Sequence, residues 1–249
     1  MKFDVLILGA GLNNGGLKDV SGVEYECMID IDGRPMVEYV VEAAANAKGC
    51  HRVALVGPAI DSPELDFVIN DNSSFFSNLQ KGVKILGKND YVLFISADIP
   101  LLTGKMIDDY LDLCTPGTAD FFYPVIPREI IQKKIPASRR TYIKLKEGSF
   151  TGGNLMLMNP GVVIDPSEWL RMMVAGRKSP WKMIRLLGVK IIIKYLLGSL
   201  SIGDVEARVE DILGYSGVAV ETQIPEIGFD VDKPLDLKLV RELFLETYT

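Results

Sequence analysis

Apolar runs alternate with helical patterns along the first half of the chain. Three runs rich in β-branched and aromatic residues predict buried strands over 4–8, 52–56 and 91–96. Apolar positions at helical spacing predict helices over 35–47, 78–86 and 104–114. Because this alternation is typical of βαβ units, we expect an α/β fold with a mainly parallel sheet flanked by helices.

The second half of the chain continues this sheet with less regular spacing. Short strands are expected within 121–126 and 152–160, separated by a basic segment that contains a proline. The segment 182–197 mixes apolar residues with four cations and is too short to span a bilayer. Packing beneath a charged stripe is favoured for it, with a membrane surface or an apolar acceptor pocket as alternatives. Since neither a repeat nor a linker divides the chain, we expect one domain over residues 1–249.

Acidic residues at the ends of two apolar runs are the first candidate chemistry. Asp98 follows the strand predicted over 91–96, and Asp230 and Asp232 follow an apolar run that leads into a helix begun by proline. Ligands of open α/β sheets bind at the carboxyl ends of strands, where carboxylates can hold a hard cation such as Mg²⁺. The alternative is that Asp98 only caps a loop or the helix that begins near Thr103. Two acidic strand tips together predict one cation between them.

A glycine loop, GAGLNNGG at 9–16, follows the first predicted strand. Its missing side chains would let backbone amides approach phosphates closely. A dinucleotide site requires G-x-G-x-x-G opening directly into a helix, with an acid about 20 residues later. Here the third glycine comes one place late and no helix is predicted before Pro35. A nicotinamide-dependent oxidoreductase is therefore the less favoured alternative.

Composition excludes several other classes of function. A net charge of −6 and a pI near 5.0 argue against a protein that wraps nucleic acid, although a single nucleotide remains compatible. Three scattered cysteines and the single histidine, His51, give poor support to a zinc site or a His-based triad. The apolar N-terminal run lacks the features of a signal peptide, so we expect a cytoplasmic protein without membrane contact.

Several segments together resemble the MobA-like nucleotidyltransferases. The resemblance rests on LILGAGLNNGG (6–16), DGRPMVEYVVEAA (32–44), ADIPLL (97–102), TGGNLMLMNP (151–160) and FDVDKPLDL (229–237). It implies a single-domain Rossmann-like fold of the GT-A type. It also implies a Mg²⁺-dependent enzyme that moves a nucleoside monophosphate from a nucleoside triphosphate to a phosphorylated small molecule, such as a molybdopterin-like compound or a sugar or polyol phosphate, and releases pyrophosphate.

The resemblance also implies roles for individual residues. It makes Asp98 a metal ligand and Asp232 its partner, with Asp230 in reserve. The residues implied to contact the nucleotide are Leu8, Gly9, Ala10 and Gly11 in the loop and Asn78 and Gly82 around the base and ribose.

A basic cluster is the best local source of charge for the phosphates. Its members and the residues that follow are Arg139, Arg140, Lys144, Gly152, Gly153 and Asn154. Arginine suits phosphate bidentately, and paired glycines indicate close approach of the backbone to a ligand. The alternative is a solvated basic loop.

One departure from the family pattern concerns the cations that grip the triphosphate. Family members usually carry R-x-G-x-x-K, or PKxLLPI, after the glycine loop. In this sequence Glu26 stands at one of these positions, and the other region offers only Lys18, which is taken as the catalytic cation. A nucleotide-binding relative that has lost its chemistry is therefore the main alternative. The sequence makes no prediction of oligomeric state.

Overall fold

The computed structural model describes residues 1–70, 74–86, 89–166 and 188–248 of the chain. Residues 182–187 of the cationic segment predicted over 182–197 lie outside these ranges. The described remainder contains a helix, α8 (Val189–Leu196), in which only Ile191 is buried while Val189, Ile193 and Leu196 are exposed. The expected packing of this segment beneath a charged stripe is therefore wrong for α8. No helix in the described ranges is long and apolar enough to cross a membrane.

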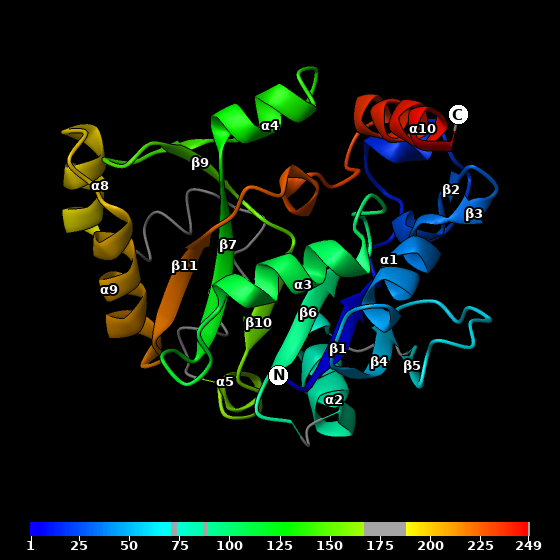
Figure 1. The fold of residues 1–249 in the computed structure, drawn as a ribbon, viewed down its shortest axis with the longest axis horizontal. Helices are drawn as coiled ribbons and strands as arrows, with labels where there is room; N and C mark the ends of the chain where they lie inside the picture. The colour runs from blue at the N-terminus through cyan, green and yellow to red at the C-terminus, as the bar shows by residue number, and fades with distance from the viewer. Residues whose placement is uncertain (71–73, 87–88, 167–187, 249) are drawn as a thin grey trace.

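One mixed sheet forms the centre of the protein. The strands are β1 (Phe3–Leu8), β4 (Cys50–Val56), β5 (Phe67–Ile69), β6 (Val92–Ser96), β7 (Phe121–Pro127), β8 (Ile143–Lys144), β9 (Ser149–Gly152), β10 (Leu155–Met158) and β11 (Gly217–Glu221). They lie in the order β5-β4-β1-β6-β10-β7-β9-β8, and β11 pairs with β7 (Figure 1). Strands β9 and β10 run opposite to the others, which confirms the expected α/β fold with a mainly parallel sheet.

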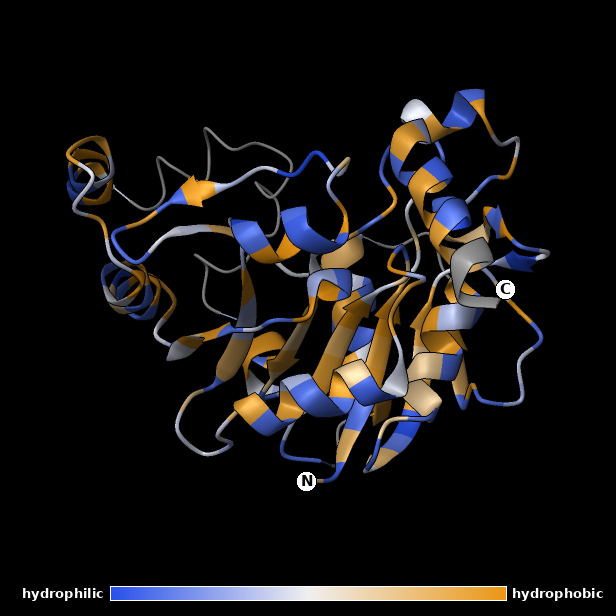
Figure 2. Ribbon diagram, turned by 45° about the horizontal axis from the view of Figure 1, so that its top comes forward, coloured by the Kyte–Doolittle hydropathy of each residue, from blue (hydrophilic) through white to orange (hydrophobic). Residues whose placement is uncertain are grey.

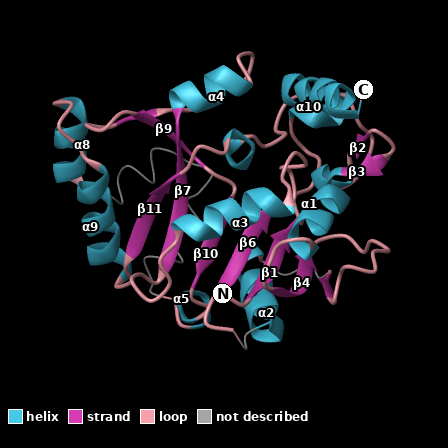
Figure 3. Cartoon of the chain, in the orientation of Figure 1, coloured by secondary structure: helices cyan, strands magenta, loops and turns pink. Residues whose placement is uncertain are grey.

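Helices cover both faces of this sheet, as Figure 3 shows. The α-helices are α1 (Met36–Ala45), α2 (Phe75–Leu86), α3 (Gly104–Leu113), α4 (Arg128–Lys134), α5 (Gly161–Ile164), α9 (Ile202–Leu213) and α10 (Pro234–Tyr248), besides α8. The remaining elements of the described ranges are the hairpin β2 (Asp30–Ile31) and β3 (Arg34–Pro35) and the 3-10 helices η1 (Gly16–Asp19), η2 (Glu26–Met28) and η3 (Pro225–Gly228).

Alternation along β1 explains how the two faces are filled. Phe3, Val5 and Ile7 pack in one core with α1 and α3, whereas Leu6 packs in a second core with α2 and α5. All four side chains are fully buried. Figure 2 shows largely apolar strands in the centre and helices in which apolar and polar residues alternate. Because both faces of the sheet are covered by helices, the sequences of the central strands are almost continuously apolar.

The predicted elements of the first half are confirmed with small shifts at their ends. Helix α3 begins where expected, since the Thr103 side chain accepts a hydrogen bond from the Met106 N–H at 3.3 Å. Residues 227–232, however, do not form a strand. They follow the strand β11 as η3 and an irregular loop, in which Pro225 begins a tight turn. Only one of the two expected acidic strand tips is therefore a strand tip, the one at Asp98.

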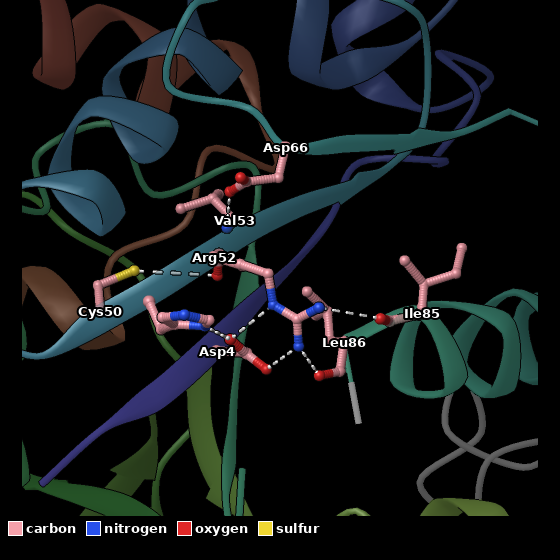
Figure 4. A network of polar contacts seen from close by, with 8 residues as sticks. Asp4, Cys50, Arg52, Val53, Asp66, Ile85 and Leu86 are labelled. Atoms are coloured by element: carbon pink, nitrogen blue, oxygen red, sulfur yellow. Dashed lines mark hydrogen bonds and ion pairs between the residues drawn. The ribbon is translucent and has the colours of Figure 1, made fainter. Parts of the chain in front are cut away.

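A buried ion pair lies at the opposite, amino-terminal edge of the central strands (Figure 4). Asp4 of β1 is fully buried, and its Oδ2 lies 2.8 Å from Nη2 of Arg52 in β4. The same guanidinium donates to the carbonyls of Ile85 and Leu86 at the end of α2. His51 Nδ1 is 3.4 Å from Asp4 Oδ1. This network fastens α2 to the sheet, and His51 belongs to it rather than to a catalytic site.

Gly82 allows α2 to lie directly against β1. A Cβ at this position would be 2.5 and 2.6 Å from the two terminal methyl groups of Leu6. Leu6 is fully buried and cannot move aside without disturbing the core.

We therefore expect Gly82→Ala to lower the free energy of unfolding by about 1 kcal/mol. Overpacking a core costs about 1–3 kcal/mol, and the better helix propensity of alanine offsets about 1 kcal/mol of this. Gly203→Ala is the matched control, because a Cβ on Gly203 in α9 would meet no atom within 4 Å. Urea denaturation measures both changes. A Gly82→Ala protein as stable as wild type would contradict this account of the packing.

Candidate functional site

Three carboxylates meet at the carboxyl end of β6. Asp98 lies two residues beyond this strand, and Asp230 and Asp232 lie in the loop between η3 and α10. The Val231 N–H donates to the Asp98 carbonyl at 2.9 Å and so fastens this loop to the strand end. One carboxylate oxygen from each of the three acids lies within 4.8 Å of the others.

The electrostatics of this acidic cluster favour a cation. Burial, and then the charge of Asp230, raise the pKa of Asp98 to about 7. Burial and Asp230 likewise raise the pKa of Asp232 to about 6. Oδ1 of Asp98 is buried and accepts no hydrogen bond within the described ranges. Crowded carboxylates with an unpaired buried oxygen fit a hard divalent cation, which prefers oxygen ligands.

Arg140 is engaged with this cluster rather than open to a ligand. Its guanidinium donates to the Asp230 carboxylate and carbonyl and lies 3.5 Å from Asp236 Oδ1. It also stacks over the Phe229 ring at 4.6 Å, and the Arg140 side chain is only 8% exposed. These contacts leave the predicted phosphate-binding role of Arg140 without support. The contacts of Arg140 instead hold the acidic loop in position.

A large cavity opens between the glycine loop, the strand ends and α2. Its volume is about 1030 Å³, at the upper end of the range for small-molecule sites. The predicted residues that line it are Leu8, Gly9, Ala10, Gly11, Asn78, Asp98 and Asn154. Lining residues that the sequence analysis missed include Asn70, Phe75, Tyr25 and Ser96. The cavity thus brings the glycine loop and the acidic cluster to one site.

The glycine loop is held in place by backbone hydrogen bonds. The Gly9 N–H donates to the Val56 carbonyl at 2.7 Å, and the Glu26 N–H donates to the Gly11 carbonyl at 3.0 Å. No acceptor in the described part of the chain pairs with the N–H groups of Ala10 and Gly11. Free amides in a fixed loop suit an anionic ligand.

Cys27 lies beneath this loop as a neutral thiol. Its Sγ donates to the Gly9 carbonyl at 3.1 Å, and it would be 3.1 Å from a Cβ placed on Gly9. Burial, and then the charge of Asp98, raise the pKa of the Cys27 thiol to about 12. Cys27 is therefore not a thiolate nucleophile at neutral pH.

A smaller cavity of about 210 Å³ lies on the other side of the acidic cluster. Asn154 lines both cavities, and Asp230 and Asp232 line the smaller one. Arg139 and Lys233 also line it, are exposed, and form no ion pair with another described residue. Lys233 was missed in the sequence, although it stands directly between Asp232 and Pro234.

Four predicted site residues line neither cavity. They are Lys18, Gly82, Lys144 and Gly153. Lys18 in η1 and Lys144 in β8 are exposed. A Cβ on Gly153 would lie 2.6 Å from Ile227 Cγ2, and one on Gly152 would lie 2.1 Å from the Tyr123 hydroxyl oxygen. The paired glycines therefore allow close packing of protein side chains, and only Gly152 also borders the smaller cavity.

Comparison with known proteins agrees with this arrangement. The sequence model of the MobA-like NTP transferase domain matches residues 23–161, a range that contains Glu26 and Asp98. A search of curated protein sequences gives no match. A hypothetical transferase from Thermus thermophilus is 34% identical, with a TM-score of 0.82, and the match covers 95% of this chain and all of that one.

Two more distant solved structures share the fold alone. A nucleotidyl transferase from Methanothermobacter thermautotrophicus is 16% identical with a TM-score of 0.61, over 99% of each chain. A CMP:2-keto-3-deoxy-manno-octonic acid synthetase solved with CTP is 14% identical with a TM-score of 0.57, over 99% of this chain and all of that one. The family model spans more than half of this chain and the Thermus thermophilus structure nearly all of it. The chain is therefore a member of the MobA-like NTP transferase family and an enzyme of the nucleotidyltransferase class.

Proposed function

We propose that this nucleotidyltransferase moves a nucleoside monophosphate from a nucleoside triphosphate to a phosphorylated small molecule, in a Mg²⁺-dependent reaction that releases pyrophosphate. The observation that carries the proposal is the acidic cluster between two cavities, the larger beside the glycine loop and the smaller beside free cations. We further propose that the whole of residues 1–249 forms this transferase domain and that it acts in the cytoplasm.

The larger cavity is the proposed nucleotide site. Phosphates would bind the free amides of Ala10 and Gly11, which lie near the carboxyl ends of β1 and β6. The base and ribose would lie toward Phe75 and Asn78 of α2, which line the same cavity. This orientation brings the α-phosphate toward Asp98.

The smaller cavity is the proposed acceptor site. Arg139 and Lys233 supply positive charge there, and Thr141 supplies a hydroxyl. Arginine and lysine side chains with no protein partner suit the phosphate of an acceptor. The position of this cavity across the acidic cluster would place an acceptor oxygen opposite the leaving pyrophosphate.

The chemistry needs positioning and charge neutralisation more than proton transfer. An oxygen of the acceptor phosphate attacks the α-phosphorus, a new P–O–P bond forms, and the bond to pyrophosphate breaks with its electron pair. The acceptor phosphate is already ionised at neutral pH, so no general base is required. A divalent cation held by Asp98 and Asp232 would supply charge neutralisation and a template. The backbone N–H groups and Arg139 orient the two substrates.

Pyrophosphate release tests this proposal. We would incubate the protein with ATP, CTP, GTP or UTP, Mg²⁺ and a panel of sugar and polyol phosphates, and measure pyrophosphate with a coupled assay. The proposal predicts release that requires both Mg²⁺ and an acceptor. One structural feature favours the alternative of a relative without transfer activity, namely the Glu26 carboxylate beside the glycine loop. That alternative predicts nucleotide binding without pyrophosphate release for any acceptor.

Replacing the free cations should weaken acceptor binding. We expect Arg139→Ala and Lys233→Ala each to raise the acceptor KM by about tenfold or more, because a charge-assisted hydrogen bond contributes about 1.5–3 kcal/mol. The KM for the nucleotide should change little. Lys144→Ala is the matched control, since Lys144 is an exposed cation that lines neither cavity. Equal acceptor KM values in all three variants would show that the acceptor does not bind in the smaller cavity.

A further inference from the structure

The larger cavity has an unusual charge for a triphosphate site. Its charged lining residues are Glu26 and Asp98, and no lysine, arginine or histidine of the described chain lines it. A nucleoside triphosphate is multiply anionic, so the cavity as built would repel it. Free amides in the loop offset part of this repulsion but carry no net charge. No side chain of the described lining therefore supplies positive charge, and a cation that accompanies the ligand would supply it.

Glu26 lies beside the glycine loop. Its Oε2 is 3.5 Å from the position of a Cβ on Gly11, and its Oε1 is 3.4 Å from that of a Cβ on Gly15. The carboxylate therefore lies alongside the glycine loop, next to the amides proposed to bind phosphates.

The position of Glu26 is fixed by its backbone. Its N–H donates to the Gly11 carbonyl, and the Asn13 N–H donates to the Glu24 carbonyl at 2.8 Å. These bonds form a short antiparallel bridge between Leu12 and Tyr25. The Glu26 carboxylate itself forms no hydrogen bond or ion pair with a side chain of the described residues. It is an unpaired acid that is half-buried in the site.

Glu26 is also separate from the acidic cluster. Among the described residues, the group of three or more possible metal ligands whose atoms all lie within 4.8 Å of one another is Asp98, Asp230 and Asp232, and Glu26 is not part of it. A cation at that cluster would thus leave the Glu26 carboxylate uncompensated. Mg²⁺ is commonly held by one or two carboxylates together with substrate phosphates and water, so a single glutamate is enough for a second site.

We infer that Glu26 binds a second divalent cation, which the β- and γ-phosphates of the nucleotide carry into the site. This inference rests on the proposed nucleotide site. The Glu26 carboxylate and its bound cation would then supply the positive charge beside the phosphates that a lysine or arginine side chain supplies elsewhere. The protein then binds the metal–nucleotide complex and rejects the metal-free nucleotide.

Counting bound Mn²⁺ tests the inference. Electron paramagnetic resonance detects free Mn²⁺, so titration with ATP, CTP, GTP and UTP in turn gives the number of Mn²⁺ ions bound per protein–nucleotide complex. We expect two for wild type and one for Glu26→Gln, with nucleotide affinity about tenfold lower in that variant, as for other losses at metal sites. Glu24→Gln is the matched control, because Glu24 is exposed and lies outside the cavity. It should bind two.

A second variant separates charge from metal binding. Glu26→Lys places a cation beside the phosphates, so we expect it to bind the nucleotide in EDTA more tightly than wild type does, and to hold one Mn²⁺ ion when Mn²⁺ is present. Thermal melting checks that each variant is folded.

Three results would overturn the inference. One is a single Mn²⁺ ion in the wild-type complex. Another is an unchanged count in Glu26→Gln, and the third is tighter nucleotide binding by Glu26→Gln at saturating Mn²⁺, which would show that Glu26 only repels phosphate. If no nucleoside triphosphate binds wild type under any condition, the proposed function fails as well. Binding with one Mn²⁺ ion would reject this inference and leave the proposed function standing.

Discussion

We expect Asp98→Asn to lower the rate of Mg²⁺-dependent pyrophosphate release by at least about 100-fold without loss of the fold. An amide keeps the shape of the side chain but lacks the charge that holds a cation. Loss of residues that only support metal ligands already costs about 10–100-fold, and loss of a ligand should cost more. Removing one of three crowded carboxylates should not lower the unfolding temperature, because the raised pKa of Asp98, caused by burial and then by the charge of Asp230, shows that its negative charge is unfavourable in the fold.

Two comparisons sharpen this prediction. Asp112→Asn is a control for the charge change, since Asp112 is exposed on α3 away from both cavities. Asp232→Asn should resemble Asp98→Asn, whereas Asp230→Asn should have a smaller effect on catalysis because Arg140 already pairs with Asp230. Wild-type activity and metal dependence in Asp98→Asn would reject the metal site. A larger loss in Asp230→Asn than in Asp232→Asn would transfer the ligand role to Asp230.

The second large effect is expected from Arg140→Ala, which should lower the free energy of unfolding by about 3 kcal/mol. The Arg140 side chain is nearly buried between Asp230 and Asp236, and Asp236 is itself buried. Removing one partner of a buried ion pair costs about 3–5 kcal/mol, because the remaining charge stays buried without compensation. Urea denaturation, with unfolding followed by circular dichroism, measures the loss.

Arg139 provides the control for this prediction. It neighbours Arg140 in the sequence but is exposed and makes no ion pair with a described residue. We expect Arg139→Ala to change stability by less than about 0.5 kcal/mol, as is usual for surface substitutions. Equal stability of the two variants would show that the contacts of Arg140 with the acidic loop contribute little.

Much of the fold follows from local patterns in the sequence. The central strands are predictable because burial on both faces requires continuous apolar runs, and α3 is predictable because Thr103 caps it. Asp98 is predictable as a site residue because a charged residue two positions beyond a buried strand lies at the edge of the sheet. The loop at 227–232 shows the limit, because an apolar run can also be buried as an irregular segment.

The remaining site features depend on contacts between distant parts of the chain. Arg140 pairs with Asp230, ninety residues away, and no local pattern distinguishes this arginine from its exposed neighbour Arg139. The role of a glycine is equally hard to predict from the sequence, because the absence of a side chain can make room for a ligand or for a neighbouring part of the protein. Only the structure shows that Gly82 faces Leu6 and that Gly153 faces Ile227.

The most direct test of the account is a calorimetric titration of the wild-type protein with ATP, CTP, GTP and UTP, in Mg²⁺ and in EDTA. A ligand site formed by the glycine loop and the acidic cluster predicts that at least one nucleotide binds in Mg²⁺, that its binding is lost in EDTA, and that Asp98→Asn weakens it. Binding of equal strength with and without Mg²⁺, or no binding of any of the four, would contradict the account.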